Sequence, residues 1–465
     1  MNFRIFSILF ILIFPFLLTA QENPLIVLGD SLVGRTIDGE SIREVHGNVV
    51  MTQGDIRITC NKAIQYIARN EAELIGKVVV IQDSIVINTD LGYYFGDTKI
   101  ASSESGVTLY DGHVNLESKK GWYYFDEKRA LFTDNVVLND NVSTLTTDKL
   151  TYFNDEDRAV AVGNVKIVDS ATVVYADSLE HNRNNKNTFA FNNVRIYDSS
   201  NKLAIFGNNF EDYGDTNYSR IFGEPLLIKI DTTDSGKLDT LFVRSKMMEA
   251  YGDSAKRLIA IDSVKIVRGE FASISGYAEF YQLKDEIYAY KRETDSNAPV
   301  LWNENAQLIG DSVFIRLKDN RLDYMKIISD ASIISKQENY EMRYDQISGK
   351  LIELFFDEDG LRRTEVEGNA LSIYYMYEAD EPNGLLKSSS ERTKIFFDNK
   401  KVSEVKLYNN PQSEYHPENM IEGKEKEFTI PTFRIFDNRP TKGTIAAQKS
   451  YLISTLKTEF ENGRE

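Results

Sequence analysis

A valine recurs every 29 residues through the first half of the chain, and this spacing constrains the fold more than any other feature. The six positions are Val49, Val78, Val107, Val136, Val165 and Val194. Other columns keep the same register, with an apolar residue two places after each valine and another nine places after it. Aligned columns over six copies indicate a repeat architecture whose units stack, because one copy cannot bury its own apolar face. We therefore expect an elongated fold.

Within one repeat, apolar and polar residues alternate as they do in half-buried β-strands. In the copy from Ala72 to Ile100, turns at Gln82-Asp83 and Gly96-Asp97 separate two such segments. Asn, Asp and Gly dominate the turns of the other copies, and these residues tolerate the positive φ of tight hairpins. Short turns after every strand favour an antiparallel meander over a parallel β-helix.

A pair of small or polar residues interrupts the first strand of each copy just before the valine. The pairs are Gly47-Asn48, Gly76-Lys77, Ser105-Gly106, Asp134-Asn135, Gly163-Asn164 and Asn192-Asn193. Because glycine inside a strand marks a bulge or a corner, we expect each strand to bend at this pair. The two halves of each strand then lie in two facing sheets with a shared interior. The predicted fold class is all-β, a stack of antiparallel bent strands built from 29-residue repeats.

The register divides the chain into four expected segments. Residues 1–20 are typical of a signal peptide, with a charged start and an apolar run from Ile5 to Leu18, although a retained anchor stays possible. Residues 21–222 hold the six repeats, and residues 223–422 are expected to repeat the architecture with insertions. Residues 423–465 lose the pattern, and we expect a tail with a short helix near Ala446 to Phe460.

Composition argues against several classes of function. The formal net charge of −17 and pI near 4.9 disfavour nucleic acid and anionic membranes as partners. Cys60 is the only cysteine, so no intramolecular disulfide can form. His46, His113 and His181 fall at different phases of the repeat, so stacking would not gather them into a metal or catalytic cluster. We expect no enzyme, no metal and no cofactor.

Two repeats carry a resemblance to a known family. The segments Gly47-Asn48-Val49-Val50-Met51 and Gly163-Asn164-Val165-Lys166-Ile167 resemble the repeat of the OstA-like family, and the resemblance extends over residues 42–222. That family includes the periplasmic lipopolysaccharide-transport protein and the soluble part of the outer-membrane lipopolysaccharide assembly protein. The resemblance implies an elongated β-jellyroll groove whose apolar interior holds acyl chains. The chain is far longer than the small periplasmic protein, yet it lacks the large barrel of the assembly protein.

The resemblance implies a periplasmic, non-enzymatic carrier or bridge that moves lipopolysaccharide, or a related glycolipid, to the outer membrane. The alternating apolar columns are the expected lipid-facing residues: Val49, Met51, Ile56, Ile58, Val78, Val80, Ile85, Ile87, Val107, Leu109, Val114, Leu116, Val136, Leu138, Val165 and Ile167. A dry core would need the same residues. An exported structural or adhesive rod without a lipid is therefore one alternative. A carbohydrate-active enzyme is another, but it needs converging Asp/Glu pairs, and the acidic residues here mostly fall in turns.

The early segment from Leu25 to Arg35 is an expected docking edge. It carries only Asp30 and Arg35 as charges and has no proline, so little protects it against pairing with another strand. We expect other jellyroll proteins of a transport bridge to dock there, end to end, by β-augmentation.

Overall fold

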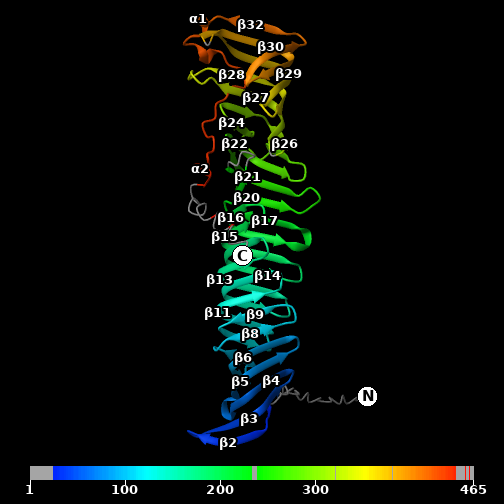
Figure 1. The fold of residues 1–465 in the computed structure, drawn as a ribbon, viewed down its shortest axis with the longest axis vertical. Helices are drawn as coiled ribbons and strands as arrows, with labels where there is room; N and C mark the ends of the chain where they lie inside the picture. Colours follow the sequence, from blue (N-terminus) through cyan, green and yellow to red (C-terminus); the bar gives the residue numbers. More distant parts are fainter. Residues whose placement is uncertain are drawn as a thin grey trace, which may run out of the picture. The chain divides into compact units, whose positions relative to one another are not determined.

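Strands make up most of the computed structural model, which describes residues 25–232, 238–319, 321–379 and 381–446, together with Leu456 and Phe460. Thirty-two strands are found in these ranges, joined by short turns and a few helices of three to five residues. The prediction of an all-β fold of stacked antiparallel bent strands is confirmed. The chain forms two compact units, residues 1–128 (unit 1) and 129–465 (unit 2), and each is described by itself (Figure 1).

Unit 1 contains ten strands whose order in the stack follows the sequence. They are β1 (Ile26–Leu28), β2 (Ser31–Ile37), β3 (Glu40–Gln53), β4 (Ile56–Tyr66), β5 (Glu71–Gln82), β6 (Ile85–Phe95), β7 (Ile100–Ser103), β8 (Val107–Tyr110), β9 (Asn115–Ser118) and β10 (Lys120–Tyr124), with a 3-10 turn, η1 (Ile67–Arg69). We call each layer of the stack a level. Some levels consist of one long strand, and others consist of two short strands that lie end to end. Thus β1 and β2 both pair with β3, and β7 and β8 both pair with β6.

Unit 2 continues this scheme with longer strands. The strands are β11 (Arg129–Asn139), β12 (Thr144–Phe153), β13 (Arg158–Val168), β14 (Thr172–Asn182), β15 (Asn187–Asp198), β16 (Leu203–Tyr213), β17 (Tyr218–Phe222), β18 (Leu226–Thr232), β19 (Leu238–Arg244), β20 (Met247–Tyr251), β21 (Arg257–Arg268), β22 (Phe271–Tyr281), β23 (Glu286–Tyr290), β24 (Val300–Asn303), β25 (Ala306–Ile309), β26 (Ser312–Lys318), β27 (Arg321–Lys336), β28 (Tyr344–Asp357), β29 (Gly360–Glu378), β30 (Glu381–Asp398), β31 (Lys401–Tyr408) and β32 (Gln412–His416). The helices are η2 (Gly214–Thr216), α1 (Glu418–Ile421), η3 (Glu425–Glu427) and α2 (Lys442–Ala446).

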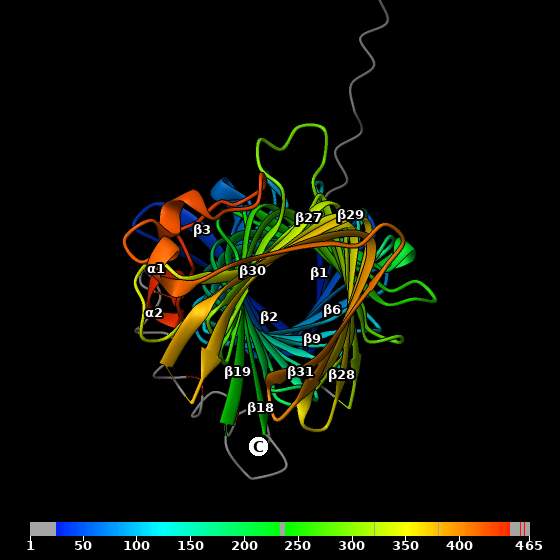
Figure 2. The same ribbon diagram turned by 90° about the horizontal axis from the view of Figure 1, so that it is seen from above.

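Each long strand contributes to two sheets, which we call leaf A and leaf B. In unit 2, leaf A holds the short strands β17, β20, β23, β26 and β31, and leaf B holds β18, β19, β24, β25 and β32. In unit 1, β2, β7 and β10 belong to leaf A, and β1, β8 and β9 belong to leaf B. Figure 2 shows the strands of unit 2 curving around a common interior.

In alternate long strands, the corner between the leaves is a pair of consecutive residues with positive φ. In β13 these are Gly163 and Asn164, with φ of 86° and 47°. The pairing with β14 shifts at this point, from Val162 to Val165, as in a β-bulge. The same shift occurs at Gly47-Asn48, Gly76-Lys77, Asp134-Asn135 and Asn192-Asn193, where the sequence predicts a bend.

Side chains from the neighbouring strand hold the corner in place. The Asn164 side-chain amide donates a hydrogen bond to the Asp148 carboxylate at 2.8 Å, and Asn193 bonds Asp177 at the same distance. A methyl group on Gly163 would lie 2.5 Å from an Asp148 carboxylate oxygen. The corner pairs are therefore mostly Gly, Asn and Asp, the residues that occupy the left-handed region at the lowest cost, with Lys77 as an exception.

A C-terminal segment, residues 417–446, crosses the strands of unit 2 instead of pairing with them, and we call it the strap. Two buried glutamines bind its backbone. Gln346 on β28 accepts the Ile430 N–H at 2.9 Å and donates to the Phe428 carbonyl at 3.1 Å. Gln307 on β25 accepts the Phe436 N–H and donates to the Arg434 carbonyl at 2.7 Å. Figure 1 shows the strap in orange and red along one side of unit 2.

Three expectations about segments concern regions that the structure describes only in part. The expected signal peptide, residues 1–20, lies outside the described residues. The expected boundary at residue 222 stays a prediction, and the two compact units meet elsewhere, at Lys128 and Arg129. In the range expected to be helical near the C-terminus, α2 ends at Ala446, and Leu456 and Phe460 are described as helical.

We expect Gly47→Ala to destabilise unit 1, whereas Gly34→Ala should leave it almost unchanged. Gly47 has a φ of 75°, and a methyl group there would meet the Asp30 carboxylate. The left-handed conformation costs a residue with a side chain about 1–2 kcal/mol. Gly34 also lies in a strand of leaf A, but nothing lies within 4 Å of its added methyl group. Urea unfolding of both variants measures the difference, and equal stabilities would contradict this account of the corner.

Candidate functional site

The interior of unit 1 is fully packed. Residues directly opposite one another on adjacent strands form a continuous row, and leaf B contributes Met51, Ile58, Val80, Ile87, Leu109 and Leu116. Each of these side chains is between 0 and 7% exposed. The valine column lies on the same face of the strands, two residues closer to the corner. In unit 1 the interior is therefore filled by the protein's own side chains.

The sixteen residues predicted to face a lipid lie along this interior in both units. Fourteen of them are buried, among them all twelve in unit 1 together with Val136 and Val165. The other two, Leu138 and Ile167, are only half-buried. The structure thus gathers the predicted residues on one interior face of leaf B. Their contact with a lipid stays a prediction.

In unit 1 a hydrogen bond joins the rims of the two leaves. The Tyr94 hydroxyl of leaf A donates to the Gln53 side-chain carbonyl of leaf B at 2.5 Å. Phe125 packs edge-on against Tyr94, with ring centroids 6.0 Å apart, and also against Tyr123. Tyr94 is completely buried, and this burial raises the pKa of its hydroxyl. We call this contact the rim seal, because it closes the interior on the side opposite the corner.

In unit 2 the side chains of the corresponding row are more exposed to solvent. On leaf B it continues through directly opposite residues: Leu138, Leu145, Ile167, Val174, Ile196, Ile205, Leu227, Val243 and Ile266. Only Leu145 in this series is buried, and the others are all half-exposed. Apolar side chains that face inward and still touch solvent must border space that the protein does not fill.

The facing rim on leaf A is also half-exposed in this region. Its row runs through Ala159, His181, Thr188 and Asp212, and a hydrogen bond of 3.0 Å joins the His181 ring nitrogen Nδ1 to the Thr188 hydroxyl. Partial burial lowers the pKa of His181 and raises that of Asp212, so the uncharged form of each is favoured. The row closer to the corner, which includes Leu179 and Ala190, is buried.

Beyond β23 the interior of unit 2 closes again. Leu301, Leu308, Met325 and Leu354 belong to one cluster of buried side chains and are at most 5% exposed. After the buried Leu145, every residue of this row from Ile167 on β13 to Ile266 on β21 is half-exposed, and we call the levels from β13 to β21 the accessible section. It is the strongest candidate site in the described residues for an elongated apolar ligand.

The outer surfaces of the two leaves differ in unit 2. On leaf B, apolar residues such as Tyr197, Phe206 and Trp302 pack beneath the strap with Ile445 and Ala446. On leaf A, aromatic rings are capped by charged neighbours. Glu249 accepts hydrogen bonds from the Tyr218 and Tyr251 hydroxyls at 2.9 Å, and the Arg257 guanidinium lies 4.7 Å above the Tyr251 ring. These rings already have partners, so they stabilise the sheet.

Two kinds of site are not found in the described part of the chain. Within the described ranges, no group of three or more His, Cys, Asp or Glu side chains is placed to hold a metal ion. Among the same residues, no helix is both long enough and apolar enough to span a membrane.

Sequence reasoning missed the accessible section and the strap. Val174 and Ile196 lie in the columns that follow the valine, so the repeat placed them on the interior face. Nothing in the columns distinguishes a residue packed in a core from one that borders open space. For the strap, a possible signal was the run of apolar residues Ile430, Phe433 and Phe436 after the last strand.

Comparisons with known proteins agree with the repeat pattern at the N-terminus. Residues 26–116 match the family model described as OstA-like protein, so this part of the chain is OstA-like. No curated protein matches the chain. A solved structure of LptH from Pseudomonas aeruginosa, entitled the LptA homologous periplasmic component of the conserved lipopolysaccharide transport device, is 17% identical. That match covers 30% of this chain and 83% of LptH with a TM-score of 0.16, too low to relate the two folds.

Cysteine labelling tests the difference between the two interiors. In a Cys60→Ser background, which removes the only native thiol, a cysteine replacing Ile196 should react with a maleimide in the folded protein. A cysteine replacing Val80 should react at least about tenfold more slowly, because opening of unit 1 must precede the reaction. Both should react equally in urea. Equal rates in the folded protein would mean that the accessible section is packed as tightly as unit 1.

Proposed function

We propose that this protein is a non-enzymatic carrier or bridge that moves lipopolysaccharide through the periplasm toward the outer membrane. The observation that carries the proposal is the accessible section, where inward-facing apolar side chains border unfilled space over the levels β13 to β21. The OstA-like match over residues 26–116 supports lipopolysaccharide, or a related glycolipid, as the lipid. In this proposal the acyl chains lie between the leaves and the sugar head group stays in solvent.

Burial of acyl chains supplies the binding energy in this proposal. Each methylene group transferred from water to an apolar surface contributes about 0.8 kcal/mol. The protein carries a formal net charge of −17, so long-range electrostatics opposes the binding of an anionic head group. Affinity must therefore come from the apolar contacts, and salt should strengthen binding slightly because it screens the repulsion.

Unit 1 takes part in the proposal through the twelve predicted lipid-facing residues that it contains. Its side chains are packed, so a lipid can enter only if the leaves separate and the rim seal between Tyr94 and Gln53 opens. In unit 2 the lipid contacts residues such as Ile167, Val174 and Ile196 without any such opening. Unit 1 thus acts as a closed segment of the path, and unit 2 as an open one.

The N-terminal edge is the proposed contact with another protein of the bridge. All seven residues of β2 are exposed, including Leu32 at 56% and Val33 at 41%. In the described part of the chain β2 pairs only with β3, so its other edge offers free N–H and C=O groups. A strand from another jellyroll protein could pair with this edge and continue the two leaves.

Photo-crosslinking in cells tests the lipid path. A photoreactive residue in place of Ile87 or Leu116, or in place of Ile196 in the accessible section, should form an adduct with lipopolysaccharide. The matched control is Glu117, the neighbour of Leu116 on the opposite face of β9, which is exposed. We expect at least about tenfold less adduct at Glu117, because successive side chains of a strand face opposite sides.

The pattern of adducts separates the alternatives. Adducts at Ile196 alone would restrict the lipid to unit 2. Equal adduct formation at Leu116 and Glu117 would show that the interior face does not define a lipid path. The absence of adducts at every position would favour a structural rod whose interior is simply a core.

Proline substitution tests the docking edge. Adjacent N–H groups of a strand point in opposite directions, so one of Leu32→Pro and Val33→Pro removes a free N–H and the other removes a bond to β3. The variant that keeps the melting temperature of the wild type should lose binding to the partner captured from cells, because an edge proline blocks strand addition. If that variant recovers the same partners with unchanged affinity, the end-to-end model fails.

A further inference from the structure

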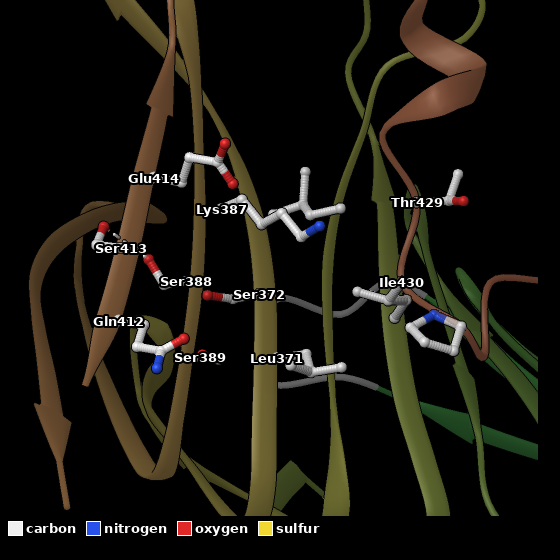
Figure 3. A pocket seen from close by; sticks show the side chains of 12 residues that line it. Leu371, Ser372, Lys387, Ser388, Ser389, Gln412, Ser413, Glu414, Thr429 and Ile430 are labelled. Atoms are coloured by element: carbon white, nitrogen blue, oxygen red, sulfur yellow. Dashed lines mark hydrogen bonds between the residues drawn. The ribbon is translucent and has the colours of Figure 1, made fainter. Parts of the chain in front are cut away.

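We propose that a pocket between the strap and the last strands of unit 2 binds a neutral saccharide (Figure 3). The pocket has a volume of about 530 Å³, within the range of about 300–1,000 Å³ that is typical of small-molecule sites. It lies on strands β29, β30 and β32, outside the accessible section. The inference therefore does not depend on the proposed lipid function.

Adjacent rungs of three strands form the sheet wall of this pocket. Residues directly opposite one another make each rung, so their spacing is fixed by the register of the sheet. One rung is Leu371, Ser389 and Gln412, and the next rung on the same face of the sheet is Ile373, Lys387 and Glu414. The serines of the rung between them, Ser388 and Ser413, face the other side of the sheet, where a hydrogen bond of 3.2 Å joins them. The backbone positions that carry the polar groups of this wall therefore have a defined spacing.

The strap supplies the opposite wall through Thr429, Ile430 and Pro431. Gln346 holds this part of the strap from both sides, because it bonds the Ile430 N–H at 2.9 Å and the Phe428 carbonyl at 3.1 Å. Ile430 is 4% exposed and packs with Ile373 in one buried cluster. Figure 3 shows Ile430 reaching from the strap toward Leu371 across the pocket. Both walls are thus fixed before any ligand arrives.

The polar groups of the pocket suit a ligand with many hydroxyl groups. In the part of the chain that the structure describes, no other side chain bonds the Lys387 ammonium or the Gln412 amide, and both residues are exposed. Lys387 can only donate, Gln412 can donate and accept, and the Glu414 carboxylate can only accept. Glu414 also lies 3.4 Å from the His416 ring nitrogen. Donors and acceptors carried side by side on adjacent strands are what a set of sugar hydroxyls requires.

The distribution of charge and apolar surface narrows the class of ligand. Lys387 and Glu414 lie directly opposite each other on adjacent strands, so the pocket carries one charge of each sign. A carboxylate at this place opposes a phosphate, and the many polar groups oppose an acyl chain. Leu371, which is half-buried, and Pro431, which is exposed, offer an apolar surface on which the C–H groups of a pyranose ring can rest. A neutral mono- or disaccharide satisfies both walls.

Isothermal titration of the full chain with glucose, galactose, N-acetylglucosamine and maltose tests the proposal. We expect at least one of these sugars to bind saturably. Lys387→Ala and Gln412→Ala should each weaken that binding at least about tenfold, which corresponds to about 1.4 kcal/mol. Both side chains are exposed, so the variants should melt at the temperature of the wild type. Lys401→Ala, an exposed lysine on β31 outside the pocket, should bind like the wild type.

Three results would overturn the proposal. The first is that none of the four sugars binds. The second is that binding survives unchanged in both Lys387→Ala and Gln412→Ala, which would place the sugar elsewhere. The third is that inorganic phosphate binds and displaces the sugar, which would mean that the pocket recognises an anion. None of these results affects the lipid proposal, since the photo-crosslinking positions are on the interior of leaf B.

Discussion

The rest of the structure depends on pairs of consecutive residues in the left-handed region, which recur at the corners between the two leaves. Alternate long strands, such as β3, β5, β11, β13 and β15, bend between the two leaves at such a pair, and this bend gives the stack an interior. Gly163 with Asn164 shows how the sequence meets this demand, by a residue without a side chain followed by an amide that bonds Asp148. The 29-residue spacing then brings every corner onto the same line, so that all strands bend together.

The interior row of leaf B is packed in unit 1 and half-exposed in unit 2. In unit 1, Met51 and Val80 are at most 3% exposed, and the rim seal between Tyr94 and Gln53 joins the leaves. In unit 2, Ile196 and Ile205 have the same place in the row but remain half-exposed. Residue type does not explain the contrast, because all four are large and apolar. What differs is the rim, where His181, Thr188 and Asp212 follow the buried tyrosines of unit 1.

The repeat allowed the fold to be predicted from the sequence. The accessible section and the strap were not predicted, because the repeat does not encode them. The valine column, the corner pairs and the turns each recur at one spacing, so they predicted strands, bends and connections together. The packing of a row depends on how far apart the leaves stand, which no single column records. The strap escaped prediction for another reason: its contacts are long-range, as between Gln307 and Phe436, and leave no periodic trace.

The strap also affects how this stack of strands can unfold. In such a stack each level contacts only its neighbours, so the loss of one level can spread without resistance from the rest. The strap joins levels far apart in sequence, since Arg439 bonds the carbonyls of Glu270 and Glu304, and Arg244 bonds that of Ile445. It follows β16 to β30 in the sequence and has no surface to bind until they are in place. Docking of the strap thus requires that those levels be assembled, and its long-range contacts afterwards couple their stabilities.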